Sequence, residues 1–358
     1  MTVRRSPRFA AALWLAAAAS GCVHRVPEPP AGWHAEEPAL RERAEGLRAT
    51  VQALVDARAN LRRIDAAEAR ARGLGLSPRR EWIDWFSLQD NLVIDLPGES
   101  PRLVYLVAHV DKTDMNLLKV LSVLVNGALD EPIGFSFLSE GALDNASGVA
   151  VVLDVARALR DDGLRHSLRV LLAGAEESGL RGARAHVAGL SAEEFARIDA
   201  VINVDSVGLA GHATCLVANE SDQGLAALAH TAATGVGVEL RDEDMPVMAG
   251  GDHSAFASTS FIEDLGRGLL FNLAGGLLPQ RSWFTTRKRA KVVAFFSCGL
   301  IDAGDVISGL LALPVGQLHG PRDNASVIDV ARLTEASLLI ERLARLLDGA
   351  PRVDERRP

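Results

Sequence analysis

Residues 141–182 constrain the fold more strongly than any other stretch, because a turn, a helix and a strand here lead to acidic side chains. Asp144 lies in a turn that contains Gly and Asn, and an apolar segment of helical character follows it. Residues 168–173 are a short apolar run typical of a buried strand, with Glu176 and Glu177 just past its end. Ligands of open α/β sheets bind at the carboxyl ends of strands, so the acidic pair marks an expected binding site.

Two interpretations of these acids remain open on this stretch alone. Neighbouring side chains past a strand point in different directions, so one of Glu176 and Glu177 can bind a metal while the other transfers a proton. Asp144 is close to the N-terminus of the following helix, where negative charge is favoured. The alternative is a solvated acidic pair and a helix cap.

Strand and helix patterns alternate along the chain. Apolar strands are expected at 91–95, 103–108, 168–173, 200–204 and 292–296. Helices are expected at 36–61, 65–74, 149–159, 225–234 and 327–347. The alternation predicts an α/β fold with a mostly parallel central sheet flanked by helices. A chain of 358 residues suits one large domain or two small ones.

Further residues that can bind a metal follow these strands. His109 and Asp111 come directly after one strand, Asp205 follows another, and a later loop supplies His319. A His and an Asp two residues apart suit a metal-binding imidazole supported by a carboxylate. Imidazoles and carboxylates without thiolates are typical of a catalytic zinc site. With the acids above, the ligands are too many for one catalytic zinc and suit two ions that share a carboxylate.

In their order and local context these residues resemble the di-zinc, co-catalytic aminopeptidase family typified by bacterial leucyl aminopeptidase and yeast aminopeptidase Y. The resemblance covers about residues 91–347 and implies the zinc aminopeptidase (phosphorylase/hydrolase-like) fold. It implies two Zn²⁺ per chain. His109 and Asp205 would bind one ion, Glu177 and His319 the other, and Asp144 both.

The resemblance also implies the roles of residues around the metal. Glu176 would be the general base, and Asp111 would orient His109. Asp252 and His253 lie in a segment, 251–256, that resembles the substrate-side loop of the family, so they are expected to bind substrate.

The implied activity is that of a zinc-dependent exopeptidase, an aminopeptidase that hydrolyses N-terminal peptide bonds with a water bridged by two zinc ions. The alternatives are a single-zinc enzyme similar to glutaminyl cyclases, a carboxypeptidase or other amide hydrolase, and a non-catalytic relative. Peptides are the expected substrates.

The chain departs from the family pattern in several places. Gly320 stands where the family usually has Thr, and Ser206 where it usually has Met. His253 and His319 are 66 positions apart, which is a longer separation than is usual in the family. We therefore expect a single peptidase domain at 36–350, with insertions near 112–139, 259–291 and 301–317.

The N-terminus has the pattern of a targeting segment. Three arginines precede an apolar stretch, 9–21, that is too short to span a bilayer and ends at Cys22. This resembles a bacterial lipoprotein signal over 1–22, which would place a lipid on Cys22 and the protein at the periplasmic face of a membrane. An ordinary secretory signal is the alternative. Residues 23–35, rich in Pro, are expected to form a stiff tether.

Charge and cysteine content add two expectations. The net charge of −8 argues against a nucleic-acid partner. Cys215 and Cys298 can form a disulfide in an oxidising compartment. Two buried free thiols explain them equally well.

Overall fold

The computed structural model describes residues 23–30, 32–34, 36–84, 87–114, 138–245, 251–257, 289–301, 305 and 315–349. The expected signal segment, with Cys22, lies outside this part of the chain, as do most residues of the three expected insertions. None of the helices in the described part has the length and apolar character needed to cross a membrane.

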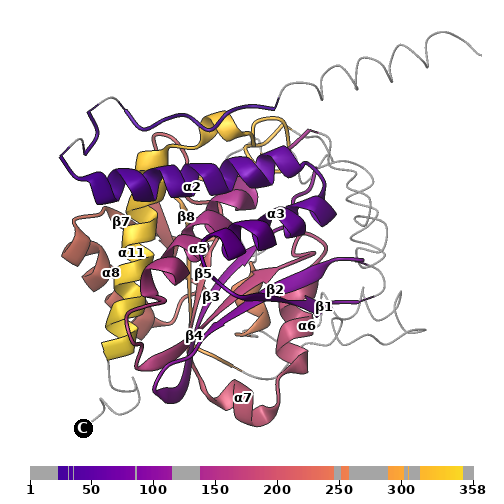
Figure 1. The fold of residues 1–358 in the computed structure, drawn as a ribbon, viewed down its shortest axis with the longest axis vertical. Helices are drawn as coiled ribbons and strands as arrows, with labels where there is room; N and C mark the ends of the chain where they lie inside the picture. The colour runs from indigo at the N-terminus through magenta and orange to yellow at the C-terminus, as the bar shows by residue number, and fades with distance from the viewer. Residues whose placement is uncertain are drawn as a thin grey trace, which may run out of the picture.

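One sheet of eight strands forms the centre of the fold, in the order β1-β2-β4-β3-β5-β8-β6-β7 (Figure 1). The strands are β1 Pro78–Trp82, β2 Asp90–Leu96, β3 Ser100–His109, β4 His166–Ala173, β5 Ile198–Val204, β6 Thr214–Val217, β7 Leu240–Glu243 and β8 Val292–Ser297. The central strands β4, β3, β5 and β8 are parallel. The pairs β1–β2, β2–β4 and β6–β8 are antiparallel, so the sheet as a whole is mixed around the expected parallel centre.

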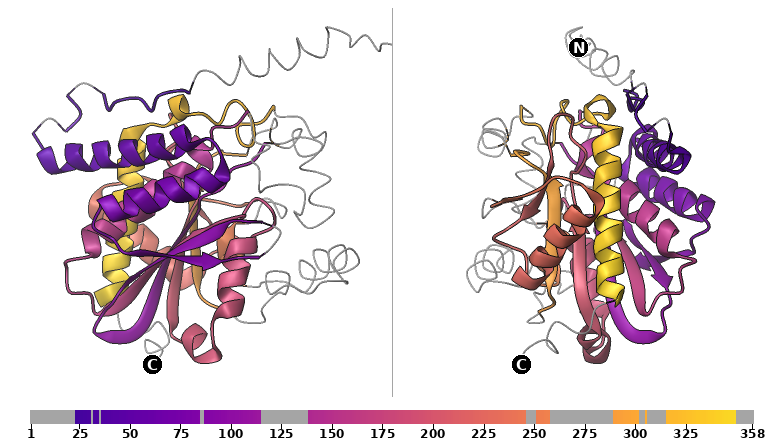
Figure 2. Two further views of the ribbon diagram at one scale, coloured as in Figure 1. Left: turned by 45° about the vertical axis from the view of Figure 1, so that its right-hand side comes forward. Right: turned by 90° about the vertical axis from the view of Figure 1, so that its left-hand side faces the viewer.

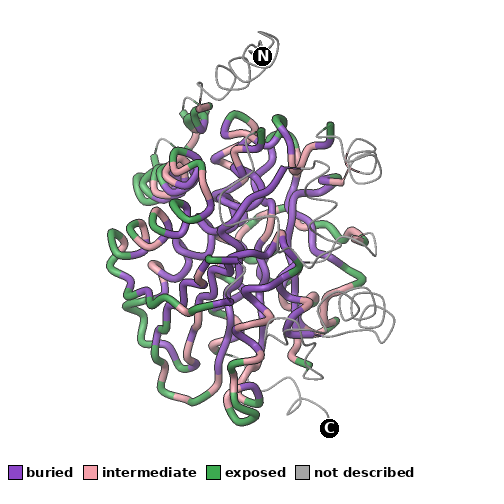
Figure 3. Tube along the Cα trace, turned by 90° about the vertical axis from the view of Figure 1, so that its right-hand side faces the viewer, coloured by how far each residue is buried: buried purple, intermediate pink, exposed green. Residues whose placement is uncertain are grey.

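Helices cover both faces of the sheet (Figure 2). They are α2 Pro38–Ala57, α3 Asn60–Gly73, α5 Gly148–Leu159, α6 Arg181–Gly189, α7 Ala192–Ala196, α8 Gln223–Val236 and α11 Val330–Gly349. The alternating side chains of β3 divide the core: Leu106 packs with α2, α5 and α11, whereas Tyr105 and Val107 pack with α6. This alternation is the two-residue period of a strand with both faces buried. Figure 3 shows buried residues concentrated along these inner layers.

The expected strands and most expected helices are present, with two kinds of difference. The expected helix at 36–61 ends at Ala57, and Arg58 adopts a positive φ of 59° before α3 begins. Strands β1, β6 and β7 were not expected from the sequence. Edge strands β1 and β7 are short and polar, so they lack the apolar run that identified the central strands.

Residues 23–30, which we call the N-terminal strap, run alongside α2 (Figure 1). Val26 is 2% exposed and belongs to the main core cluster. Its backbone N–H donates to Gln52 Oε1 on α2 at 2.9 Å. This part of the expected tether is therefore packed on the domain.

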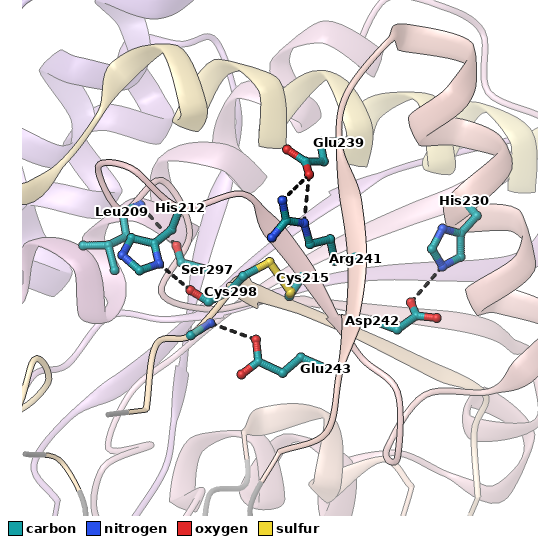
Figure 4. The surroundings of a disulfide bond; sticks show 11 residues. Leu209, His212, Cys215, His230, Glu239, Arg241, Asp242, Glu243, Ser297 and Cys298 are labelled. Carbon is teal, nitrogen blue, oxygen red and sulfur yellow. Dashed lines mark hydrogen bonds and ion pairs between the residues drawn. A yellow bond between two sulfur atoms is a disulfide. The ribbon is translucent and has the colours of Figure 1, made fainter. Parts of the chain in front are cut away.

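Cys215 and Cys298 form a disulfide, which resolves the two alternatives left open by the sequence (Figure 4). It joins β6 to the residue that follows β8, with 4.9 Å between the two Cα atoms. The adjacent Gly299 N–H donates to Glu243 Oε2 on β7 at 2.8 Å. The disulfide therefore lies within the antiparallel side of the sheet.

Candidate metal centre

The sheet topology brings the predicted site residues to one edge. Strand β3 lies between β4 and β5 and is parallel to both. The last residue of β3, His109, pairs with Ala173 at the end of β4, and Asp205 directly follows β5. The loop after β4 carries Glu176 and Glu177, so three neighbouring strands supply one cluster at their carboxyl ends.

Asp144 lies between two imidazoles. Its Oδ1 is 3.0 Å from His109 Nε2, and its Oδ2 is 3.1 Å from His319 Nε2. His109 Nε2 also lies 3.4 Å from Asp205 Oδ1, and His319 Nε2 lies 3.2 Å from Glu177 Oε2. Each oxygen of Asp144 thus faces a different set of ligand atoms.

The donor atoms fit divalent metal ions. Within each set, His109–Asp144–Asp205 and Asp144–Glu177–His319, the potential ligand atoms all lie within 4.8 Å of one another. Histidine nitrogen and carboxylate oxygen without thiolate is the donor chemistry of catalytic zinc. A third set of this kind contains His109, Glu176 and Glu177, so geometry alone does not separate the two glutamates.

The charge balance of the cluster also fits bound cations. Burial lowers the pKa of His109, but the charges of Asp205 and Glu176, with the contacts of Asp111 and Asp144, outweigh burial and raise this pKa well above its ordinary value. Burial raises the pKa of Asp252 to about 8, although the nearby His109 lowers it. Both carboxyl oxygens of Asp252 are buried and have no hydrogen-bond partner among the described residues. Such a concentration of buried acids is costly unless positive charge compensates it.

Asp111 holds the loop that carries the acidic pair. Its two carboxylate oxygens accept hydrogen bonds from the backbone N–H groups of Glu176 at 3.0 Å and Glu177 at 3.2 Å. His109 Nδ1 lies 3.2 Å from the backbone oxygen of Asp111 and 3.7 Å from its Oδ1. Asp111 is therefore placed beside His109, and its carboxylate also fixes the backbone of both glutamates.

Asp144 belongs to the irregular turn Ala142–Ser147, directly before α5. The side chain of the next residue, Asn145, accepts at its Oδ1 from the N–H of Gly148, the first residue of α5, at 2.9 Å, and from Ser206 N–H at 3.2 Å. Asn145 Nδ2 donates to the carbonyl of Val204 at 3.0 Å. The hydrogen bond to the first N–H of α5 is therefore made by Asn145, and not by Asp144 as the helix-cap interpretation expected. Asn145 also connects this turn to the loop that carries Asp205.

The two predicted substrate-side residues lie in a 3₁₀ turn, Asp252–Ala255. Asp252 and His253 are both buried. The charge of Asp252 acts on His109 and Glu176, so the structure places it beside the cluster. His253 Nε2 lies 2.5 Å from Glu220 Oε2, in the loop after β6.

Sequence reasoning missed two residues that hold the site together. Arg63, fully buried on α3, donates to the carbonyls of Val110 at 2.6 Å, Glu140 at 3.0 Å and Gly141 at 3.0 Å. Asp323 accepts from Leu143 N–H at 2.8 Å, next to Asp144. Asp323 lies four positions after His319 in the same loop, and this closeness in sequence was a usable signal. Arg63 lies in a helix that contains several other arginines, so nothing in the sequence distinguishes it from them.

Ser206, one of the departures from the family pattern, has a contact of its own. Its hydroxyl donates to Asp205 Oδ1 at 3.1 Å. Asp205 is the most exposed acid of the first set, with 23% of its side chain accessible. The Met expected at this position has no hydroxyl to make this bond.

Comparisons with known proteins agree with this geometry. The model of peptidase family M28 matches residues 91–265. The chain is 32% identical to Aminopeptidase YwaD of Bacillus subtilis (strain 168) over 108 residues, which cover 30% of this chain and 19% of that protein. The matched segment thus spans less than a quarter of this relative.

Two solved structures share the fold over most of the chain. The LapA aminopeptidase of Legionella pneumophila aligns with a TM-score of 0.58 at 15% identity, covering 92% of this chain and 78% of that one. A glutaminyl cyclase of Porphyromonas gingivalis aligns with a TM-score of 0.57 at 16% identity, covering 85% and 98%. At these identities the likeness concerns the fold alone. The segment that matches the model of peptidase family M28, residues 91–265, contains His109, Asp144, Glu176, Glu177 and Asp205, which lie together at the strand ends.

Proposed function

We propose that this chain is a zinc-dependent exopeptidase, an aminopeptidase that hydrolyses N-terminal peptide bonds. The observation that carries the proposal is the position of Asp144, whose two oxygens face two separate sets of ligand atoms. The name of the relative YwaD supports an aminopeptidase in particular.

The two sets would hold two Zn²⁺. His109, Asp144 and Asp205 form one position, and Asp144, Glu177 and His319 form the other. Zinc bound there supplies Lewis acidity, which polarises the scissile carbonyl and makes water a better nucleophile at neutral pH.

Glu176 is assigned as the general base. It is absent from both sets that share Asp144, yet its backbone is fixed by Asp111 next to Glu177. Its carboxylate would take the proton from the attacking water and pass it to the leaving amine. Asp252, a buried carboxylate beside the cluster, suits the positively charged amino terminus of a peptide.

We further propose that the protein is exported and held at the periplasmic side of a membrane by a lipid on Cys22. The basic and apolar segment before Cys22 supports export. The Cys215–Cys298 disulfide also supports it, since such bonds persist in oxidising compartments. Cys22→Ser should release the protein from the membrane fraction. Unchanged fractionation would leave an ordinary secreted protein.

The test of function is metal analysis of the purified protein combined with a screen of aminoacyl fluorogenic substrates. Two zinc ions per chain and release of the fluorophore from free-amine substrates are expected. One ion per chain with cyclisation of N-terminal glutamine would replace the proposal with a glutaminyl cyclase. Cleavage of N-acetylated substrates at an equal rate would exclude an aminopeptidase.

A further inference from the structure

The N-terminal strap is bound to the domain by more than its buried valine. Gln52 on α2 pairs with the strap backbone: Gln52 Oε1 accepts from Val26 N–H at 2.9 Å, and Gln52 Nε2 donates to the carbonyl of His24 at 3.3 Å. The burial of Val26 and this reciprocal pair fix the position of His24 relative to α2. These contacts hold the backbone of His24 at a fixed position beside α2.

Within the part of the chain that the structure describes, His24 contacts one acid, Glu140. Its backbone N–H donates to Glu140 Oε1 at 2.9 Å, and its Nδ1 lies 2.8 Å from the same oxygen. The other carboxylate oxygen of Glu140, Oε2, accepts from Ala325 N–H at 2.9 Å. One carboxylate thus joins the strap to the loop that follows His319.

The backbone of Glu140 also makes hydrogen bonds to both sides of the site. Its N–H donates to the carbonyl of Asp323 at 2.9 Å, and its carbonyl accepts from Arg63 at 3.0 Å. Glu140 directly precedes Gly141 and the turn of Asp144. It is the point where the turn carrying Asp144 and the loop carrying His319 meet the strap.

We propose that His24 and Glu140 are positioning residues, through which the N-terminal strap sets the spacing between Asp144 and His319. These two side chains are in contact, with 3.1 Å between Asp144 Oδ2 and His319 Nε2. They belong to the same set of ligand atoms, whereas His109 and Asp205 are placed by strand ends. Because Asp144 belongs to both sets, loosening the strap should weaken both metal positions, and the position that also contains His319 should weaken more. The metal part of this inference rests on the proposed function, but the positioning of the two loops does not.

The first test is hydrogen exchange on the metal-free full-length protein. His24→Ala removes the ring contact. Arg25→Ala is the matched control, because the adjacent Arg25 pairs with the exposed Asp56, at 3.5 Å, and with no other acid among the described residues. Loss of one hydrogen bond corresponds to about a three- to tenfold change in an opening equilibrium. Exchange at the amides of Leu143 and Ala325 should rise by about this factor in His24→Ala and stay at the wild-type rate in Arg25→Ala.

Two variants of Glu140 sharpen the test. Glu140→Gln keeps one oxygen that can accept from either the strap or Ala325, whereas Glu140→Ala keeps none. Exchange at Leu143 and Ala325 should increase in the order wild type, Glu140→Gln, Glu140→Ala. Val26→Asp, which places a charge at a buried position of the strap, should reproduce the Glu140→Ala pattern if the strap acts as a unit.

The second test is stepwise zinc titration monitored by calorimetry. His24→Ala should weaken one of two zinc-binding steps by about three- to tenfold and the other by less, since partners behind direct ligands tune metal affinity. The inference is overturned if exchange at both amides and both binding steps stay at wild-type values in His24→Ala. It is also overturned if Arg25→Ala causes the same change. A wild-type protein that binds no zinc would end the proposed function, and the exchange experiment would still decide the positioning role.

Discussion

Asp144 Oδ2 and His319 Nε2 lie 3.1 Å apart. The two residues are distant in sequence, because Asp144 precedes α5 and His319 lies in the loop before α11. The other oxygen of Asp144 makes the corresponding contact with His109, at 3.0 Å. A single carboxylate therefore connects the central sheet to the loop that precedes α11.

Replacement of Asp144 should remove both metal ions together. Asp144→Ala deletes the one side chain shared by the two sets of ligand atoms. Inductively coupled plasma analysis after gel filtration should find no bound zinc. Asp323→Asn is the control, because Asp323 holds the same turn without belonging to either set. One tightly bound ion in Asp144→Ala would make Asp144 a ligand of a single metal.

Glu176 and Glu177 can be separated by a matched pair of substitutions. Glu176→Gln should lower kcat by about 10²- to 10⁴-fold with metal content unchanged, because a general base is lost and no ligand is removed. Glu177→Gln should instead lose one ion. Turnover in Glu176→Gln above a hundredth of wild type, or loss of metal there, would reverse the assignment.

Glu81 should contribute pH-dependent stability through His186. The two side chains are 2.8 Å apart, and His186 Nε2 lies 3.0 Å from the hydroxyl of Tyr105. Burial raises the pKa of Glu81, but the contacts with His186, Asn91 and Arg79 together outweigh burial and lower it from 4.5 to about 2. A depressed pKa in the folded state stabilises the protein above pH 4.5, and this contribution is lost as the pH falls from 4.5 towards 2.

Glu81→Gln should therefore lower the free energy of unfolding at pH 7 by about 1–2 kcal/mol, a value discounted for solvent screening of this partly exposed pair. Urea unfolding at pH 7 and at pH 3 measures the effect. The difference from wild type should shrink at the lower pH. Glu99→Gln, at an exposed acid between β2 and β3, is the control. An equal loss at both pH values would mean that packing, and not ionisation, explains the effect.

The disulfide should stabilise the fold substantially. Its cysteines are separated by 83 positions in the sequence, and closing such a long loop constrains the unfolded chain. The double variant Cys215→Ser and Cys298→Ser should lose about 2–5 kcal/mol of unfolding free energy in denaturant titrations. Dithiothreitol should bring the wild type to the same midpoint. A double variant as stable as the oxidised wild type would contradict the prediction.

The central strands and the ligand cluster could be predicted from sequence because both leave local patterns. Apolar runs such as 103–108 identify buried strands, and His109 follows one directly. In a parallel sheet the carboxyl ends of neighbouring strands lie at the same edge, so the residues that follow these strands are expected to lie close together. The family resemblance supplied the roles of the individual ligands, and these roles remain proposals.

Other features depend on contacts between distant parts of the chain and leave no local pattern. The edge strand β1 is polar and becomes a strand by pairing with β2. Arg63 is one of 38 basic residues, and only its burial beneath the Asp144 turn distinguishes it. Val26 is buried by α2, so part of the Pro-rich sequence that is expected to be a stiff tether packs against the domain.

The position of the disulfide determines what a protease cut of the backbone does to the protein. Cys215 precedes, and Cys298 follows, both the Asp252–Ala255 turn and residues 258–288. A single break of the backbone anywhere between the two cysteines leaves two fragments joined by sulfur. The fragment with His319 then stays attached to the fragment with Asp144, so the cut protein keeps both residues in one covalent molecule.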